Sequence, residues 1–163
     1  MAWLIAGLGN PEDRYARTRH NLGRMVAEDL ARGAGERLRK VRFLPVEVAE
    51  IRVGDERVLL ARSTRFMNES GPSYASLAKK HGIEPSRLIA VHDELDIPAG
   101  TLRVKLGGGN SGHNGLRSLD HALRSPDYLR VRVGIGRPPG RQDPADFILQ
   151  PVARRDEGDL ALV

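Results

Sequence analysis

A histidine and an aspartate are the residues of this sequence that could activate a water molecule. His20 follows the first apolar segment of the chain, and Asp93 follows a later one. An imidazole beside a carboxylate acts as a general base, because the carboxylate fixes the tautomer and stabilises the imidazolium that forms. A His–Asp pair that serves only the fold is the alternative interpretation.

No side chain accompanies this pair as an obvious nucleophile. The chain has no cysteine, and Ser111 stands in Gly-Asn-Ser-Gly, which differs from the Gly-x-Ser-x-Gly nucleophile elbow. The absence of cysteine also excludes disulfides, cysteine-ligated zinc and iron–sulfur clusters. A general base without a nucleophile indicates attack by water.

Asparagine is scarce and lies beside glycine or proline at most of its positions. Turn formation explains such positions, since asparagine tolerates left-handed backbone. Asn68 is different because it follows Phe66-Met67 and has no adjacent glycine. An amide donates and accepts hydrogen bonds, which suits it to hold an ester or a peptide bond. The five asparagines are Asn10, Asn21, Asn68, Asn110 and Asn114.

Three competing motifs fail. A dinucleotide fingerprint beginning at Gly7 has Glu12 where its third glycine belongs. The glycine-rich stretch 107–112 is followed by His113-Asn114 rather than by the lysine and hydroxyl residue of a P-loop. The acidic run after residue 91 lies on a strand, where neighbours point to opposite faces and rarely share an ion. We therefore expect no nucleotide cofactor and no metal.

The elements that must position these residues alternate along the chain as in α/β proteins. Asn10 and Asp93 each follow a predicted strand, and His20 begins the helix after the first one. If the two strands are parallel, these side chains meet at one edge of a sheet, where open α/β sheets bind ligands. The patterns predict strands over 3–6, 46–53, 57–61, 88–91, 102–106 and 129–135, and helices over 22–31, 74–81, 115–123 and 144–149.

Length and composition fit one soluble domain with a basic surface. The chain has 163 residues, 40% of them apolar, and a net charge of +5. It lacks the run of ~20 apolar residues that a membrane helix needs, and no basic residue precedes its apolar start, so we expect a cytoplasmic protein without a signal peptide. The positive charge permits a polyanionic partner.

Basic residues gather in two stretches and on one strand. Residues 101–119 contain three basic residues and no acid, and residues 31–45 contain five with one glutamate. The strand 129–135 alternates Arg130 and Arg132 with valines, which predicts one charged face. The basic residues of the two stretches, 101–119 and 31–45, are candidate phosphate contacts, although a solvated charged surface is the simpler interpretation for any one of them.

Three motifs together resemble bacterial peptidyl-tRNA hydrolases across nearly the whole chain. The first is Gly7-Leu-Gly-Asn-Pro11 with Tyr15-Ala-Arg-Thr-Arg-His-Asn-Leu-Gly23. The second is Phe66-Met-Asn-Glu-Ser-Gly71, and the third joins His92-Asp-Glu-Leu-Asp96 to Lys105-Leu-Gly-Gly-Gly-Asn-Ser-Gly-His-Asn-Gly-Leu116. The resemblance implies a single α/β domain with a twisted mixed β-sheet surrounded by helices.

The resemblance also implies hydrolysis of the ester between a peptide and the 3′ ribose of tRNA. It assigns His20 as the general base, Asp93 as its orienting carboxylate and Asn10 as a residue that positions substrate and stabilises the transition state. Asn68 and Asn114 are expected to hold the peptide, with Met67, Tyr15, Phe66 and His113 around them. Lys105, Arg132 and Arg103 are expected to bind tRNA at its 5′ phosphate. We expect a monomer without a cofactor.

Two features depart from the family pattern. Glu69 replaces a usual apolar residue within the second motif, and Arg65 precedes this motif where a small or neutral residue is common. Family members continue into a long C-terminal helix, whereas this sequence ends just after a helix is predicted to begin near residue 154, so we expect that helix to be missing. A protein of this fold that only binds RNA, like a plant splicing factor of the family, and an unrelated esterase or aminopeptidase remain the alternatives.

Overall fold

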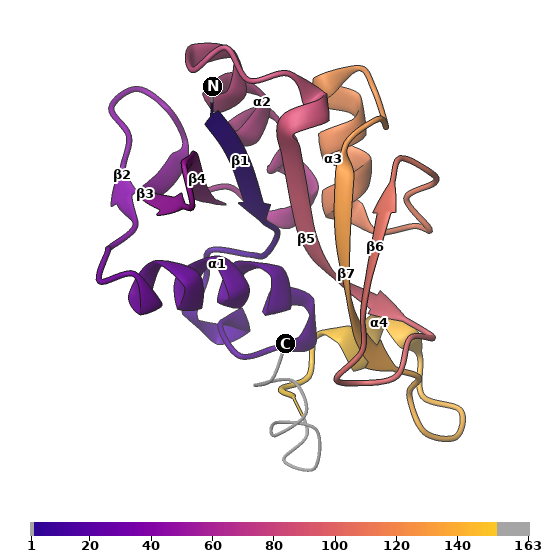
Figure 1. Cartoon of the computed structure of the whole chain (residues 1–163). Coiled ribbons are helices and arrows are strands. Elements are labelled where there is room, and N and C mark those ends of the chain that lie inside the picture. The colour runs from indigo at the N-terminus through magenta and orange to yellow at the C-terminus, as the bar shows by residue number, and fades with distance from the viewer. Residues whose placement is uncertain (1, 153–163) are drawn as a thin grey trace.

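A seven-stranded mixed sheet runs through the protein, whose computed structural model describes residues 2–152. The strand order is β2-β3-β4-β1-β5-β7-β6 (Figure 1). The strands are β1 (Ala2–Gly7), β2 (Arg39–Lys40), β3 (Val46–Val53), β4 (Glu56–Ser63), β5 (Leu88–Leu95), β6 (Leu102–Leu106) and β7 (Leu129–Gly136). The single α/β domain expected from the sequence is confirmed.

The four central strands are parallel. β1 pairs in parallel with both β4 and β5, and β5 pairs in parallel with β7. β2, β3 and β6 join antiparallel. Because β1 and β5 are parallel neighbours, the residues that follow them reach the same edge of the sheet, as the sequence predicts.

Helices cover both faces of this sheet (Figure 1), as a parallel sheet requires. Leu4 and Ala6 of β1 pack in a core with α2 and α3, while Ile5 packs on the opposite side with α1 residues. The helices are α1 (Leu22–Gly33), α2 (Gly71–Lys80), α3 (Asn114–Leu123) and α4 (Pro144–Ile148). Short 3-10 turns lie at Asp13–Tyr15 (η1), Arg19–Asn21 (η2), Met67–Glu69 (η3) and Pro85–Arg87 (η4).

Two element boundaries differ from the sequence prediction by three residues or more, and both matter for the site. β5 continues to Leu95 because its polar residues pair with β7, with His92 opposite Arg132. α2 begins at Gly71, three residues early. A Cβ on Gly71 would lie 2.1 Å from the Ser118 carbonyl oxygen, so only glycine lets α2 and α3 pack this closely.

The expected helix near residue 154 lies outside the described residues. Within residues 2–152, no helix combines the length and the apolar character needed to cross a membrane.

Candidate active site

The start of α1 is docked closely on β5, and this contact delivers His20 to the sheet edge. A Cβ on Gly23 would lie 2.0 Å from the Val91 carbonyl oxygen, so the contact requires glycine. The Leu8 N–H donates to the same oxygen at 3.1 Å, and the Arg24 N–H donates to the Leu8 oxygen at 3.1 Å. The contact point on β5, Val91, lies two residues before Asp93. The turn η2, which precedes α1, is therefore held close to Asp93.

A second segment braces η2 from the far end of the described chain. The buried Arg19 guanidinium donates to the Phe147 carbonyl at 2.9 Å, and its central carbon lies 3.8 Å from the centre of the Phe147 ring. The Arg19 N–H donates to the Gln150 oxygen at 3.1 Å, and the Val152 N–H donates to the Arg17 oxygen at 3.2 Å. We call residues 147–152 the clasp. Sequence reasoning missed it, because contacts this far apart along the chain leave no local pattern.

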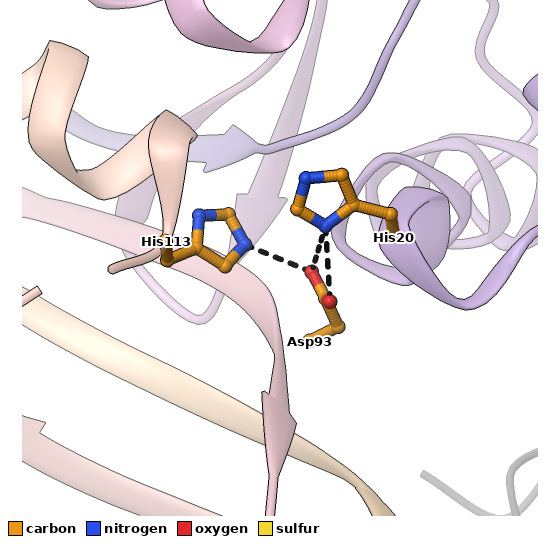
Figure 2. A group of neighbouring side chains, drawn as sticks. All are labelled: His20, Asp93 and His113. Atoms are coloured by element: carbon orange, nitrogen blue, oxygen red, sulfur yellow. Dashed lines mark hydrogen bonds and ion pairs between the residues drawn. The ribbon is translucent and has the colours of Figure 1, made fainter. Parts of the chain in front are cut away.

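His20 and Asp93 form a direct, buried pair (Figure 2). Nδ1 of His20 lies 3.0 Å from each carboxylate oxygen of Asp93. An ionised carboxylate only accepts hydrogen bonds, so Nδ1 carries the proton and donates it. Nε2 of His20 then holds a lone pair and has no hydrogen-bond partner among the described residues.

His113 shares the same carboxylate. Its Nε2 lies 2.8 Å from Asp93 Oδ1, and its ring centre lies 4.8 Å from that of His20 (Figure 2). At the first turn of α3, the N–H groups of Gly115 and Leu116 donate to Nδ1 of His113 at 3.1 and 3.3 Å. Nδ1 is therefore unprotonated and Nε2–H donates to Asp93. The resemblance placed His113 beside the substrate; its bond to the carboxylate is an added finding.

Charge and burial act in opposite directions on this cluster. Burial raises the pKa of Asp93, but the facing His20 and His113 outweigh it, so the pKa lies far below its usual value. Burial lowers the pKa of His20, but the charge of Asp93 and its hydrogen bond outweigh this, and the pKa is raised above 6.5. The carboxylate is thus ionised and the imidazole is a strengthened base.

These three side chains are also the group within residues 2–152 that could ligate a metal ion. One ligand atom from each of His20, Asp93 and His113 lies within 4.8 Å of the others. The acidic run from His92 to Asp96, considered from sequence, forms no such group in the described part of the chain. The same atoms already make hydrogen bonds of 2.8–3.0 Å, which account for their approach.

Asn10 lies in a network that orients its side chain. The Asn10 side-chain oxygen accepts from the Met67 N–H at 2.7 Å, which leaves its NH2 group as the available donor. Asn21, fully buried, holds the Asn10 backbone through bonds of 2.8 Å to its N–H and 2.9 Å from the Asn21 amide to its carbonyl. Asn21 is thus a structural support, which the turn-forming interpretation did not foresee.

Two clefts meet at His20. The larger, about 440 Å³, contains all the residues expected to hold the peptide except His113, together with Asn10. The smaller, about 240 Å³, contains Asp93, Glu94, His113 and the end of the glycine-rich loop. Both clefts share His20, Asn114 and Ile148. The residues of the larger cleft that the sequence singled out are Asn10, Tyr15, Phe66, Met67, Asn68 and Asn114.

The expected tRNA contacts lie beyond the smaller cleft, at the β6–β7 edge. A small cavity of about 60 Å³ is lined by Lys105, Arg130 and Arg132, with Glu94 as its acidic residue. Arg103 lies opposite Arg132 across β6 and β7 and is exposed. Four cations therefore share one face of this strand pair.

Arg130 corrects the expectation of a charged, solvated face on β7. It is only 2% exposed, and its guanidinium donates to the Gly109 carbonyl at 2.8 Å and to Asp120 at 3.2 Å. Tyr128 donates to the same Asp120 oxygen at 2.6 Å. The buried arginine therefore ties the glycine-rich loop to the sheet.

Comparisons with known proteins agree with this geometry. A family model described as peptidyl-tRNA hydrolase matches residues 4–163. The chain is 53% identical over 161 residues to a peptidyl-tRNA hydrolase of Frankia alni, covering 99% of this chain and 81% of that protein. It is 50% identical over 162 residues to one of Mycobacteroides abscessus, covering 99% and 83%.

Solved structures show the same likeness. The crystal structure of the peptidyl-tRNA hydrolase of Acinetobacter baumannii superposes with a TM-score of 0.90 at 34% identity, covering 98% of this chain and 81% of that one. A crystal structure of a peptidyl-tRNA hydrolase in complex with N-propanol gives the same values.

Proposed function

Because the chain belongs to the peptidyl-tRNA hydrolase family, we propose that it hydrolyses the ester between a peptide and the 3′ ribose of tRNA with water activated by His20. The observation that carries this mechanism is the buried pair of His20 Nδ1 and Asp93, 3.0 Å apart, which leaves Nε2 at the junction of two clefts. Hydrolysis returns free tRNA to translation.

In the first step a water molecule held by Nε2 of His20 attacks the ester carbonyl carbon. The proton passes to Nε2, and the ionised Asp93 stabilises the imidazolium that forms. His20 then returns the proton to the departing 3′ oxygen of the ribose. The products are a peptide with a free carboxylate and a tRNA with a free 3′ hydroxyl.

Asparagine side chains supply the remaining polar contacts. The free NH2 of Asn10 is placed to donate to the substrate carbonyl as it becomes an oxyanion, and one such donor is worth about 3 kcal/mol. Asn68 and Asn114 line the larger cleft, where they can bond the peptide backbone. Met67, buried beneath them, provides an apolar wall, with Phe66 and Tyr15 at the cleft.

The tRNA body is assigned to the cationic edge of the sheet. Lys105 and Arg132 line the small cavity and bind the 5′ phosphate, with Arg103 beside them. The terminal 5′ phosphate and the 3′ end lie at the same end of a tRNA, so one molecule can reach this cavity and the clefts at His20. The chain acts as a monomer in the cytoplasm, where translation releases its substrate.

The decisive experiment compares N-acetyl-aminoacyl-tRNA with unblocked aminoacyl-tRNA as substrates of the wild type and of His20→Ala. We expect hydrolysis of the blocked ester only, and a loss of about 10²–10⁴-fold or more in rate for His20→Ala. Tight tRNA binding without hydrolysis by the wild type would instead support an RNA-binding protein. Preference for the unblocked ester would support an aminopeptidase.

A further inference from the structure

Glu94 forms an ion pair with Arg132, one of the residues proposed above to bind the 5′ phosphate. Its Oε1 accepts from Arg132 Nη2 at 3.0 Å. Both side chains are largely buried, at 12% and 28% exposure, so solvent screens this ion pair less than a surface pair. In the free protein the cation expected to bind tRNA already has an anionic partner.

The surroundings show that this edge has an excess of positive charge. Lys105 lies directly opposite Arg130, and Arg103 lies directly opposite Arg132. Like charges in these positions repel each other. Asp120 compensates Arg130 and Glu94 compensates Arg132, whereas Arg103 and Lys105 have no acidic partner among residues 2–152.

The ion pair of Glu94 and Arg132 can open without breaking another side-chain hydrogen bond of Glu94 within residues 2–152. The second oxygen of Glu94 lies 3.6 Å from His92 Nδ1, beyond hydrogen-bond distance. That nitrogen donates instead to the Asp93 backbone carbonyl at 2.8 Å. Burial and the neighbouring His113 lower the pKa of His92 to about 4, so it is uncharged and offers Glu94 no ion pair near neutral pH.

Further hydrogen-bond donors line the same cavity. The Lys105 ammonium lies over Gly108, 2.8 Å from where a Cβ of residue 108 would be. Nε of the buried Arg130 has no hydrogen-bond partner in the described structure. An anion that enters therefore meets further donors besides Arg132.

We propose that Glu94 is an internal competitor of the tRNA 5′ phosphate, which must displace its carboxylate from Arg132 to bind. This inference rests on the function proposed above. Because of Glu94, a ligand gains full access to Arg132 only if it carries a phosphate that also reaches Lys105. Glu94 lines both this cavity and the smaller cleft at His20, so the displacement takes place beside the catalytic carboxylate.

The test measures equilibrium binding of deacylated tRNA by fluorescence anisotropy, with and without its 5′ phosphate. Glu94→Gln keeps the shape of the side chain and removes its charge. We expect it to bind 5′-phosphorylated tRNA about threefold to tenfold more tightly, the change that corresponds to a partly buried ion pair. The gain should disappear on 5′-hydroxyl tRNA and when Glu94→Gln is added to Arg132→Gln.

Glu50→Gln is the matched control. Glu50 pairs with Arg57 at 2.9 Å on β3 and β4, so this variant makes the same charge change far from the β6–β7 edge. We expect its affinity to stay within twofold of the wild type. Glu94→Asp, which keeps the charge but draws it back from Arg132, should give a smaller gain.

Unchanged or weaker binding by Glu94→Gln would overturn the proposal, because it would make Glu94 a mere support for Arg132. An equal gain on 5′-hydroxyl tRNA would overturn it as well. Hydrolysis of N-acetyl-aminoacyl-tRNA by the wild type is measured alongside. If the wild type hydrolyses this ester and Glu94→Gln shows no gain in binding, only the competitor role of Glu94 fails. If the wild type does not hydrolyse this ester, the proposed function itself fails.

Discussion

Replacing Asp93 with asparagine tests the proposed mechanism most directly, because the two side chains have nearly the same shape. The asparagine oxygen can still accept from Nε2–H of His113, whose Nδ1 is held by the amides of α3. Its NH2 group then faces Nδ1 of His20 and must donate to it. The proton of His20 moves to Nε2, and the imidazole can no longer accept a proton from water.

The size of the effect follows from the geometry of the pair. A unit charge 3.0 Å from Nδ1 contributes about 5 kcal/mol to the imidazolium at an effective dielectric constant of about 20. Losing that stabilisation lowers the rate by between ~10³ and ~10⁴. Part of the change appears in pH dependence, since His20 must be neutral to act and activity therefore rises with pH through its pKa.

The assay records the rate of N-acetyl-aminoacyl-tRNA hydrolysis from pH 5 to pH 9. For the wild type we expect a midpoint above 6.5, because the pKa of His20 is raised. In Asp93→Asn the burial that lowers this pKa remains without the carboxylate, so residual activity should have a lower midpoint. Asp29→Asn makes the same charge change on exposed α1 and should retain wild-type activity.

A rate for Asp93→Asn within tenfold of the wild type, or an unshifted midpoint, would refute this reasoning. Either result would mean that Asp93 neither sets the tautomer of His20 nor stabilises its charged form. Circular dichroism and a melting curve for the variant separate this outcome from a loss of fold.

Three other substitutions test separate parts of the structure. Gly23→Ala places a methyl group against the Val91 carbonyl. The overpacking, about 1–3 kcal/mol, should lower the melting temperature by several degrees, and the displacement of His20 should lower the turnover number about 10²-fold. Lys105→Ala should raise KM for the tRNA ester and reduce the salt dependence of that KM by about one unit of log–log slope, with little change on a minimal ester that lacks the tRNA body. Equal losses on both substrates would contradict a tRNA contact. Arg130→Met leaves Asp120 without its cation and the Gly109 carbonyl without its donor. Denaturant unfolding should therefore show a free energy of unfolding lower by about 3–5 kcal/mol, and an unchanged value would mean that the glycine-rich loop does not depend on these hydrogen bonds.

The sequence predicts the placement of His20, Asn10 and Asp93 because strand order along the chain limits where strand ends can meet. Two apolar segments, each followed by polar residues, are enough to predict that these side chains meet, provided that β1 and β5 are parallel neighbours. The boundaries of β3 and β6 follow equally directly from alternation and turns.

The sequence could not show which side chains pair across the fold. His113 precedes a helix like any other capping residue, and only the structure brings its ring to Asp93. Arg130 alternates with valines as an exposed residue would, but its burial depends on Asp120 and on the loop carbonyl it bonds. Glu94 and Arg132 lie on different strands, so the pairing of β5 with β7 had to be known first.

The clasp fixes the order in which this catalyst is completed. A ribosome makes the chain from its first residue, so Arg19 and His20 exist long before Phe147 and Gln150, which hold their turn in place. These contacts, which brace the turn that carries the base, can form only after residue 152 has been made. Throughout that time the growing chain is itself esterified to a tRNA, and it carries an unfinished copy of the machinery that would release it.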